Sequence, residues 1–178
     1  LALVPAVPDK LGFLRDYMRP YIPEGIEASW EWRTLEDMMD RIDASKYVTD
    51  LAFLVAHGPV RLAAMGFDNR PATPEELERM KALVAAGMES GAVGLSSGLI
   101  YPPGCFAGTE ELVELCRVVA RYGGVYATHM RSESGDLLKS VAEAIDIGRR
   151  SGCAVYISHH KVMKQFEGNS EKTLGMID

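Results

Sequence analysis

The stretches GGVYATHMRSE (residues 123–133) and GCAVYISHHK (152–161) decide the fold class. Each contains an apolar run that follows glycine and ends on histidine, and the helix-like segment 134–150 lies between them. Val, Ile, Tyr and Ala fill both runs without polar alternation until the last residues, which is typical of strands covered on both faces. We therefore predict two parallel strands, 125–130 and 154–160, joined by a helix.

The same alternation of strand and helix extends along the chain. Apolar runs predict strands, and amphipathic segments with capping residues predict helices, at a spacing of about 30 residues for each strand–helix unit. The predicted strands are 25–30, 51–58 and 91–100, and the predicted helices are 34–45, 109–122, one that begins at Thr73 and one within the last ten residues. The fold class is therefore α/β with a parallel sheet covered by helices.

Two parallel architectures compete for this pattern. A doubly wound nucleotide-binding fold needs a glycine-rich fingerprint, but the sequence has neither GxGxxG nor GxxxxGK[ST]. A (β/α)8 TIM-type barrel places its chemistry where strands end, and the polar residues gather there: His57, Ser96–Ser97, Thr128–His129 and Ser158–His160. Since a complete barrel needs about 250 residues, we expect residues 1–178 to be a single segment that supplies four or five strand–helix units of a partial barrel.

The composition excludes several classes of function. The 178 residues carry a net charge of −6 with acids and bases interleaved, which argues against a nucleic-acid surface. No apolar run is long enough to predict a membrane helix, and no signal peptide is recognisable at the N-terminus. The three scattered cysteines predict reduced thiols and a cytoplasmic protein.

His129 and His159 are the candidate metal ligands. Neighbouring strands lie about 4.8 Å apart, so imidazoles at the ends of successive parallel strands converge on one ion, and neutral imidazole is a usual ligand of Zn²⁺. His159 and His160 cannot both point inward, because successive strand residues face opposite sides; parity alone does not choose between them. Lys161 is either a cation that holds a carboxylate near the metal or a surface lysine.

The motifs GAVGLSSGLIYPPG (91–104), TEELVEL (109–115), GGVYATHMRSE and YISHHKVM (156–163), together with SWEW (29–32) and LVAHGPVR (54–61), resemble the N-acyl-D-amino-acid deacylases (D-aminoacylases) of the amidohydrolase superfamily. This resemblance covers nearly the whole chain, and the THMR and SHHK blocks are its most specific parts.

The resemblance implies roles for individual residues. His129 and His159 correspond to zinc ligands, Lys161 to a residue that binds the substrate α-carboxylate, and Ile100 and Tyr101 to the side-chain pocket. It assigns no catalytic role to His57. It also implies that an HxH pair and a bridging cysteine precede this segment and that the general-base aspartate follows it, so we expect the segment to be inactive alone.

For the intact enzyme, the resemblance implies zinc-dependent hydrolysis of a small N-acyl-D-amino acid to a carboxylate and a free D-amino acid. Two alternatives remain. One is another amidohydrolase that acts on cyclic amides, and the other is a metal-free scaffold domain with structural histidines. The sequence does not encode a recognisable oligomeric state.

Overall fold

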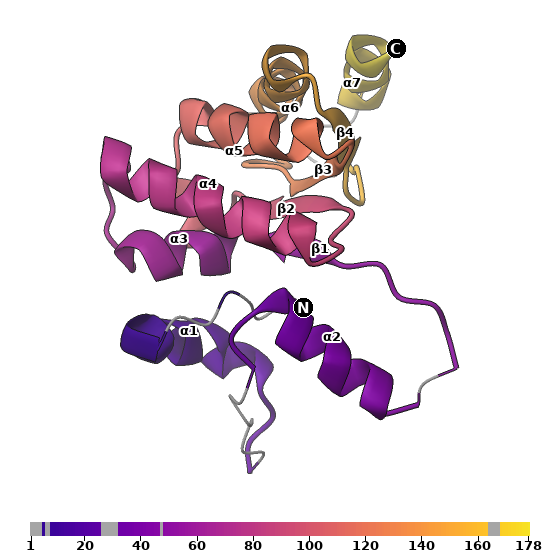
Figure 1. The fold of residues 1–178 in the computed structure, drawn as a ribbon. Coiled ribbons are helices and arrows are strands. Elements are labelled where there is room, and N and C mark those ends of the chain that lie inside the picture. Colours follow the sequence, from indigo (N-terminus) through magenta and orange to yellow (C-terminus); the bar gives the residue numbers. More distant parts are fainter. Residues whose placement is uncertain (1–4, 6–7, 26–31, 47, 164–167) are drawn as a thin grey trace.

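Four parallel strands in chain order form the sheet in the described part of the chain (Figure 1). The computed structural model describes residues 5, 8–25, 32–46, 48–163 and 168–178. The strands are β1 (Leu54–Ala56), β2 (Gly94–Gly98), β3 (Val125–His129) and β4 (Ala154–Ile157). Their order, β1-β2-β3-β4, has no reversal. Sequential order is that of a (β/α)8 barrel, whereas a doubly wound sheet reverses direction at a switch point. The predicted partial barrel is confirmed.

Helices connect the strands and pack in the same sequential order. The α-helices are α1 (Leu11–Met18), α2 (Leu35–Ala44), α3 (His57–Met65), α4 (Pro74–Glu89), α5 (Thr109–Arg121), α6 (Leu137–Ser151) and α7 (Asn169–Ile177), and the 3-10 helices are η1 (Pro8–Lys10), η2 (Arg19–Tyr21) and η3 (Gly104–Phe106). Each helix from α3 to α6 packs against the next, and α4 and α5 lie across the front of the sheet in Figure 1. None of the helices in the described part of the chain is long and apolar enough to cross a membrane.

Capping chemistry explains where two of the predicted helices begin. The side chain of Thr34 accepts a hydrogen bond from the N–H of Asp37, whose carboxylate accepts in return from the N–H of Thr34. Thr73 and Glu76 form the same reciprocal pair at the start of α4. Such a capping box satisfies N–H groups that the first turn of a helix leaves without partners.

The two faces of the sheet differ in burial. Leu95 and Tyr126, which stand opposite each other in β2 and β3, face the helices and are fully buried. The prediction that every strand is covered on both faces is wrong for β4, where burial alternates and Tyr156 is 62% exposed. The four strands of the described residues do not close a barrel, so in this part of the chain no further strand closes off the face opposite the helices.

The prediction that the strand ends at His57 and Gly58 is also wrong. β1 ends at Ala56, and His57 is the first residue of α3, so His57 lies on a helix and not at the end of a strand. Pro59 suits the first turn of a helix, where its missing N–H needs no partner. The helix α1 was not predicted, and the strand predicted at 25–30 lies, except for Gly25, outside the described residues.

All three cysteines belong to the described residues and carry free thiols, as predicted. Cys116 and Cys153 are buried, and Cys105 is partly exposed.

Candidate metal centre

Two histidines meet at the ends of β3 and β4. Nδ1 of His129 lies 2.9 Å from Nε2 of His159, and their ring centroids are 4.6 Å apart. The strand register pairs Thr128 with Ile157, so Ser158 is the residue level with His129. His159 lies one position further on and reaches His129 because its backbone is left-handed, with φ of 36°. The predicted convergence of the two rings is therefore present, although their offsets along the strands differ by one residue.

The neighbouring His160 points elsewhere. Its Nε2 lies 3.0 Å from Oγ1 of Thr173, a fully buried residue of α7. The structure thus distinguishes His159 from His160, which strand parity could not do.

Glu133 lies beside the two histidines, so three side chains of types that can bind a metal meet here. It follows His129 by four residues, in the connection between β3 and α6, and is 9% exposed. Its Oε1 lies 3.2 Å from Nδ1 of His159 and 3.9 Å from Nε2 of His129. Among the described residues, the ligand atoms of these three side chains lie within 4.8 Å of one another. Sequence reasoning gave Glu133 no role, although a carboxylate four residues after a strand-end histidine was a usable signal.

The surroundings of His129 and Glu133 favour the forms of these two side chains that bind metals. Burial and the charges of His159 and Lys161 lower the pKa of His129, and together they outweigh the raising effect of Glu133. Burial raises the pKa of Glu133, but the hydrogen bond from Lys161 and the nearby cationic groups outweigh it, so this pKa lies below its usual value. His129 is therefore neutral and Glu133 ionised near pH 7.

The donor set fits a zinc ion. Nε2 of His129 is buried and has no hydrogen-bond partner among the described residues. Neutral imidazole nitrogen and carboxylate oxygen are both ordinary zinc ligands, and metal binding requires the deprotonated form of each. His129 and His159, with Glu133 beside them, could hold such an ion.

Lys161 and Tyr101 also lie at this centre. Nζ of Lys161 is 2.6 Å from Oε1 of Glu133 and 3.4 Å from Nδ1 of His159. The ring centroid of Tyr101 is 5.3 Å from that of His129. Tyr101 and Ile100 are 47% and 44% exposed, so a ligand could contact both side chains. The structure brings the two histidines, Lys161 and Tyr101 together, with Ile100 adjacent in sequence.

Known proteins with the same sequence pattern are deacylases. The chain is 40% identical over 151 residues to the D-aminoacylase of Alcaligenes xylosoxydans xylosoxydans, and 35% identical over 150 residues to the N-acyl-D-aspartate deacylase of the same organism. These alignments cover 84% and 83% of this chain. The chain belongs to the N-acyl-D-amino-acid deacylase family. It spans about a third of the length of these relatives, namely 31% and 30%. No protein-family model matches it.

Solved deacylase structures share the fold. The crystal structure of N-acyl-D-glutamate deacylase from Bordetella bronchiseptica, complexed with zinc and a phosphonate inhibitor that mimics the tetrahedral intermediate, matches all of this chain with a TM-score of 0.84 and 34% identity. A D-aminoacylase structure described as defining a novel subset of amidohydrolases matches 99% of the chain with a TM-score of 0.81 and 36% identity. The matches cover 36% and 35% of those chains.

In this deacylase segment, Arg131 joins the candidate metal centre to the loop that carries Tyr101. Its guanidinium donates to the backbone carbonyls of Cys105 at 3.1 Å and Ala107 at 2.9 Å, and to both carboxylate oxygens of Glu143. Arg131 follows His129 by two residues. One side chain therefore fixes the β2–α5 loop against the end of β3.

His57, which had no assigned role in the deacylase pattern, belongs to a separate buried network. Nε2 of His57 lies 2.8 Å from Oε1 of Glu111, and Arg61 forms an ion pair with the other oxygen of Glu111. His57 and Arg61 are completely buried. This network ties α3 to α5, so His57 has a structural position in it.

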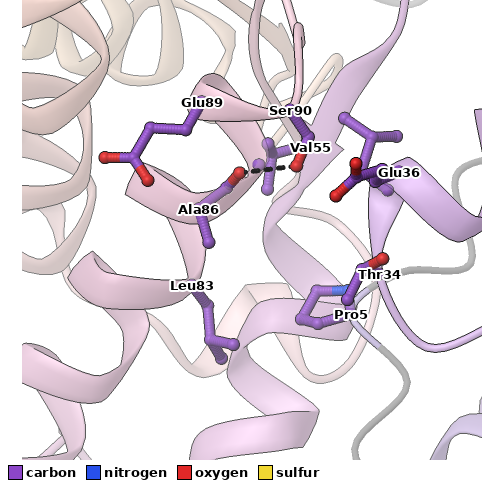
Figure 2. Close-up of a pocket in the computed structure, with 10 residues that line it drawn as sticks. Pro5, Thr34, Glu36, Val55, Leu83, Ala86, Glu89 and Ser90 are labelled. Carbon is purple, nitrogen blue, oxygen red and sulfur yellow. Dashed lines mark hydrogen bonds between the residues drawn. The ribbon is translucent and has the colours of Figure 1, made fainter.

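A cavity of about 520 Å³ lies between α2, α4 and β1 (Figure 2). Apolar side chains such as Val55 and Leu83 line it, with the carboxylates of Glu36 and Glu89 at its margin. None of its lining residues belongs to the group formed by the two histidines and Glu133.

Proposed function

We propose that the intact protein is a zinc-dependent amidohydrolase that cleaves N-acyl-D-amino acids to a carboxylate and a free D-amino acid. The observation that carries this proposal is the convergence of His129 and His159, with Lys161 beside them, in a chain of the deacylase family. In this proposal, residues 1–178 are a single segment from the centre of the barrel. His129 and His159 are zinc ligands, and Lys161, Ile100 and Tyr101 contact the substrate.

In this proposal some residues of the chain bind the metal and others bind the substrate. Bound zinc supplies a Lewis acid that polarises an amide carbonyl and lowers the pKa of water. Lys161 offers a fixed positive charge to the substrate α-carboxylate, because an ammonium carries three N–H donors and Glu133 does not use all of them. Tyr101, beside His129, and Ile100 supply the wall for the amino-acid side chain.

This arrangement also accounts for stereochemical preference. Three fixed points are needed to distinguish mirror images: the amide carbonyl, the α-carboxylate and the side chain. The zinc site, Lys161 and the Ile100–Tyr101 wall supply one point each. We expect the general base, an aspartate, to come from another part of the intact enzyme, as the family resemblance implies.

The test is to incubate the intact protein with N-acetyl-D-amino acids, their L enantiomers and a cyclic amide, and to follow the released amine or ring-opened product. We expect release from the D series alone, loss of activity on treatment with a chelator, and recovery with Zn²⁺. Equal rates on both enantiomers, or none on either, would refute the D-specific proposal, and turnover of the cyclic amide alone would favour the alternative amidohydrolase.

A variant pair tests the role of Lys161 directly. Lys161→Met should raise KM by about tenfold or more, since a hydrogen bond to a charged group contributes about 1.5–3 kcal/mol. Lys139→Met is the matched control, because Lys139 is 84% exposed and pairs only with Asp136 in the described structure. An unchanged KM in Lys161→Met would remove Lys161 from the substrate site.

A further inference from the structure

We propose that Glu133 is a positioning residue that fixes the spacing between the zinc site and the carboxylate-binding lysine. This inference rests on the proposed function and deepens it. It predicts a preference for N-acyl-α-amino acids over N-acyl-β-amino acids, whose carboxylate lies one methylene further from the amide.

Both oxygens of Glu133 are occupied by neighbouring side chains. Nζ of Lys161 lies 2.6 Å from Oε1 and 2.6 Å from Oε2. Nδ1 of His159 lies 3.2 Å from Oε1. One buried carboxylate thus holds a lysine and a histidine that are 3.4 Å apart.

His159 needs such a partner to be oriented. Its side chain is 52% exposed and sits on a left-handed backbone turn, so packing does little to fix its ring. The contact with Glu133 occupies Nδ1 and leaves Nε2 available as a ligand atom. Nε2 of His159 faces Nδ1 of His129 at 2.9 Å. A carboxylate on the far nitrogen of a histidine ligand is a common means of fixing its tautomer and ring orientation.

Lys161 is fixed by the same carboxylate. Its side chain is 54% exposed, whereas that of Glu133 is 11% exposed. A half-exposed lysine has a flexible four-carbon chain, and pairing with an almost buried partner confines the ammonium to one place. The distance between the His159 ring and the ammonium is then set by Glu133, which contacts both half-exposed side chains.

A direct role for Glu133 as third metal ligand is the competing interpretation, because its oxygens lie within reach of the histidine nitrogens. The ammonium of Lys161 opposes it. An ion on either oxygen would bring a dication next to a fixed positive charge, and the like-charge repulsion would weaken both contacts.

The test compares Glu133→Gln with the control Asp136→Asn in the intact protein. Asp136 lies three residues further along and has a 64% exposed side chain. Three quantities are measured: zinc affinity by chelator competition, KM for N-acetyl-D-amino acids and their β-amino-acid analogues, and the tautomer of His159 by ¹⁵N NMR of the metal-free protein. The NMR readout needs neither zinc nor turnover, so its failure is distinguishable from failure of the proposed function.

We expect Glu133→Gln to weaken zinc binding by about 10–100-fold, the usual effect of losing an outer-shell partner. KM for the α-amino-acid substrates should rise about tenfold, the preference over the β-amino-acid analogues should fall, and the Nδ1–H tautomer of His159 should lose its dominance. Asp136→Asn should match the wild type in all three.

Wild-type values for Glu133→Gln would overturn the proposal. So would a loss of zinc affinity far beyond 100-fold with an unchanged KM and tautomer, because that result identifies a direct ligand. If the glutamine variant does not fold, Glu133→Asp, which keeps the charge but shortens the side chain, is measured in the same way. We expect its changes in zinc affinity, KM and tautomer to have the same direction and to be smaller.

Discussion

Replacing Glu111 with glutamine tests the buried network that joins α3 to α5. Arg61 is fully buried and Glu111 is 6% exposed, so the substitution leaves a guanidinium charge in the interior without its carboxylate. Removing one partner of a buried ion pair costs about 3–5 kcal/mol. Arg61 also donates to the carbonyl of Arg70 at 2.7 Å, which keeps part of the guanidinium satisfied. We therefore expect Glu111→Gln to lower the free energy of unfolding by the lower end of this range, about 3 kcal/mol.

The pKa of Glu111 gives the pH dependence of this contribution. Burial raises that pKa, but the hydrogen bond and charge of His57 and the charge of Arg61 outweigh it, so the folded-state value lies below the usual one. A depressed carboxyl pKa stabilises the folded state above the unfolded-state pKa of about 4.3, and the contribution is lost as pH falls through the folded value. The difference between wild type and Glu111→Gln should therefore shrink in acid.

The assay is urea unfolding of the intact protein at pH 7, with Glu110→Gln as the matched control. Glu110 is adjacent on the same helix, but its side chain is 75% exposed and pairs with Arg150 at the surface. Exposed pairs contribute about 0–1 kcal/mol. A double variant, Arg61→Met with Glu111→Gln, should recover part of the lost stability, because it also removes the buried guanidinium charge that Glu111→Gln leaves without its carboxylate. Equal losses for Glu111→Gln and Glu110→Gln would refute the reasoning.

Three further outcomes are expected. Arg131→Lys should speed hydrogen exchange in residues 99–108 and raise KM while zinc content stays the same, because lysine cannot reproduce the guanidinium contacts with the two loop carbonyls. Gly94→Ala should cost about 3 kcal/mol or more by thermal unfolding, since the added Cβ would lie 2.0 Å from a carbonyl oxygen of β3. The pKa of Glu76 should be about 2 by carboxyl ¹³C NMR, because hydrogen bonds from Arg70 and from the backbone N–H of Thr73 stabilise the ionised carboxylate. Arg70→Ala should raise this pKa. Lowering the pH below 4 should destabilise the start of α4, because the carboxylate becomes protonated.

Controls separate these effects from general damage. Gly175→Ala, where the added Cβ meets no atom within 4 Å, should be neutral or stabilising by up to about 1 kcal/mol. Arg117→Lys, at a 52% exposed surface pair, should leave exchange and KM unchanged. Equal melting temperatures for the two glycine variants, unchanged exchange in Arg131→Lys, or an ordinary pKa for Glu76 would each count against the corresponding contact.

Much of the fold could be predicted from local patterns. The apolar runs that become β3 and β4, and the capping box at Thr73, depend on residues close in sequence, and the structure contains all three. The boundary at His57 could not be predicted, because a short apolar run followed by Gly58 and Pro59 fits the end of a strand as well as the start of a helix.

The candidate site was predictable in its residue types but not in its geometry. Histidines at successive strand ends indicated a shared ion, yet the choice of His159 over His160 depends on one left-handed backbone angle. The position of Glu133 between His159 and Lys161 depends on the path of the β3–α6 connection. Neither a turn angle nor a loop path follows from hydrophobic periodicity.

Zinc affinity of the intact protein, measured for His159→Ala and His160→Ala beside the wild type, tests the metal centre most directly. His159 faces His129 across 2.9 Å, whereas His160 bonds Thr173. We predict that His159→Ala weakens zinc binding by more than the roughly 100-fold expected for an outer-shell residue, and that His160→Ala binds zinc as the wild type does. Equal affinities in the two variants, or a loss confined to His160→Ala, would contradict the assignment.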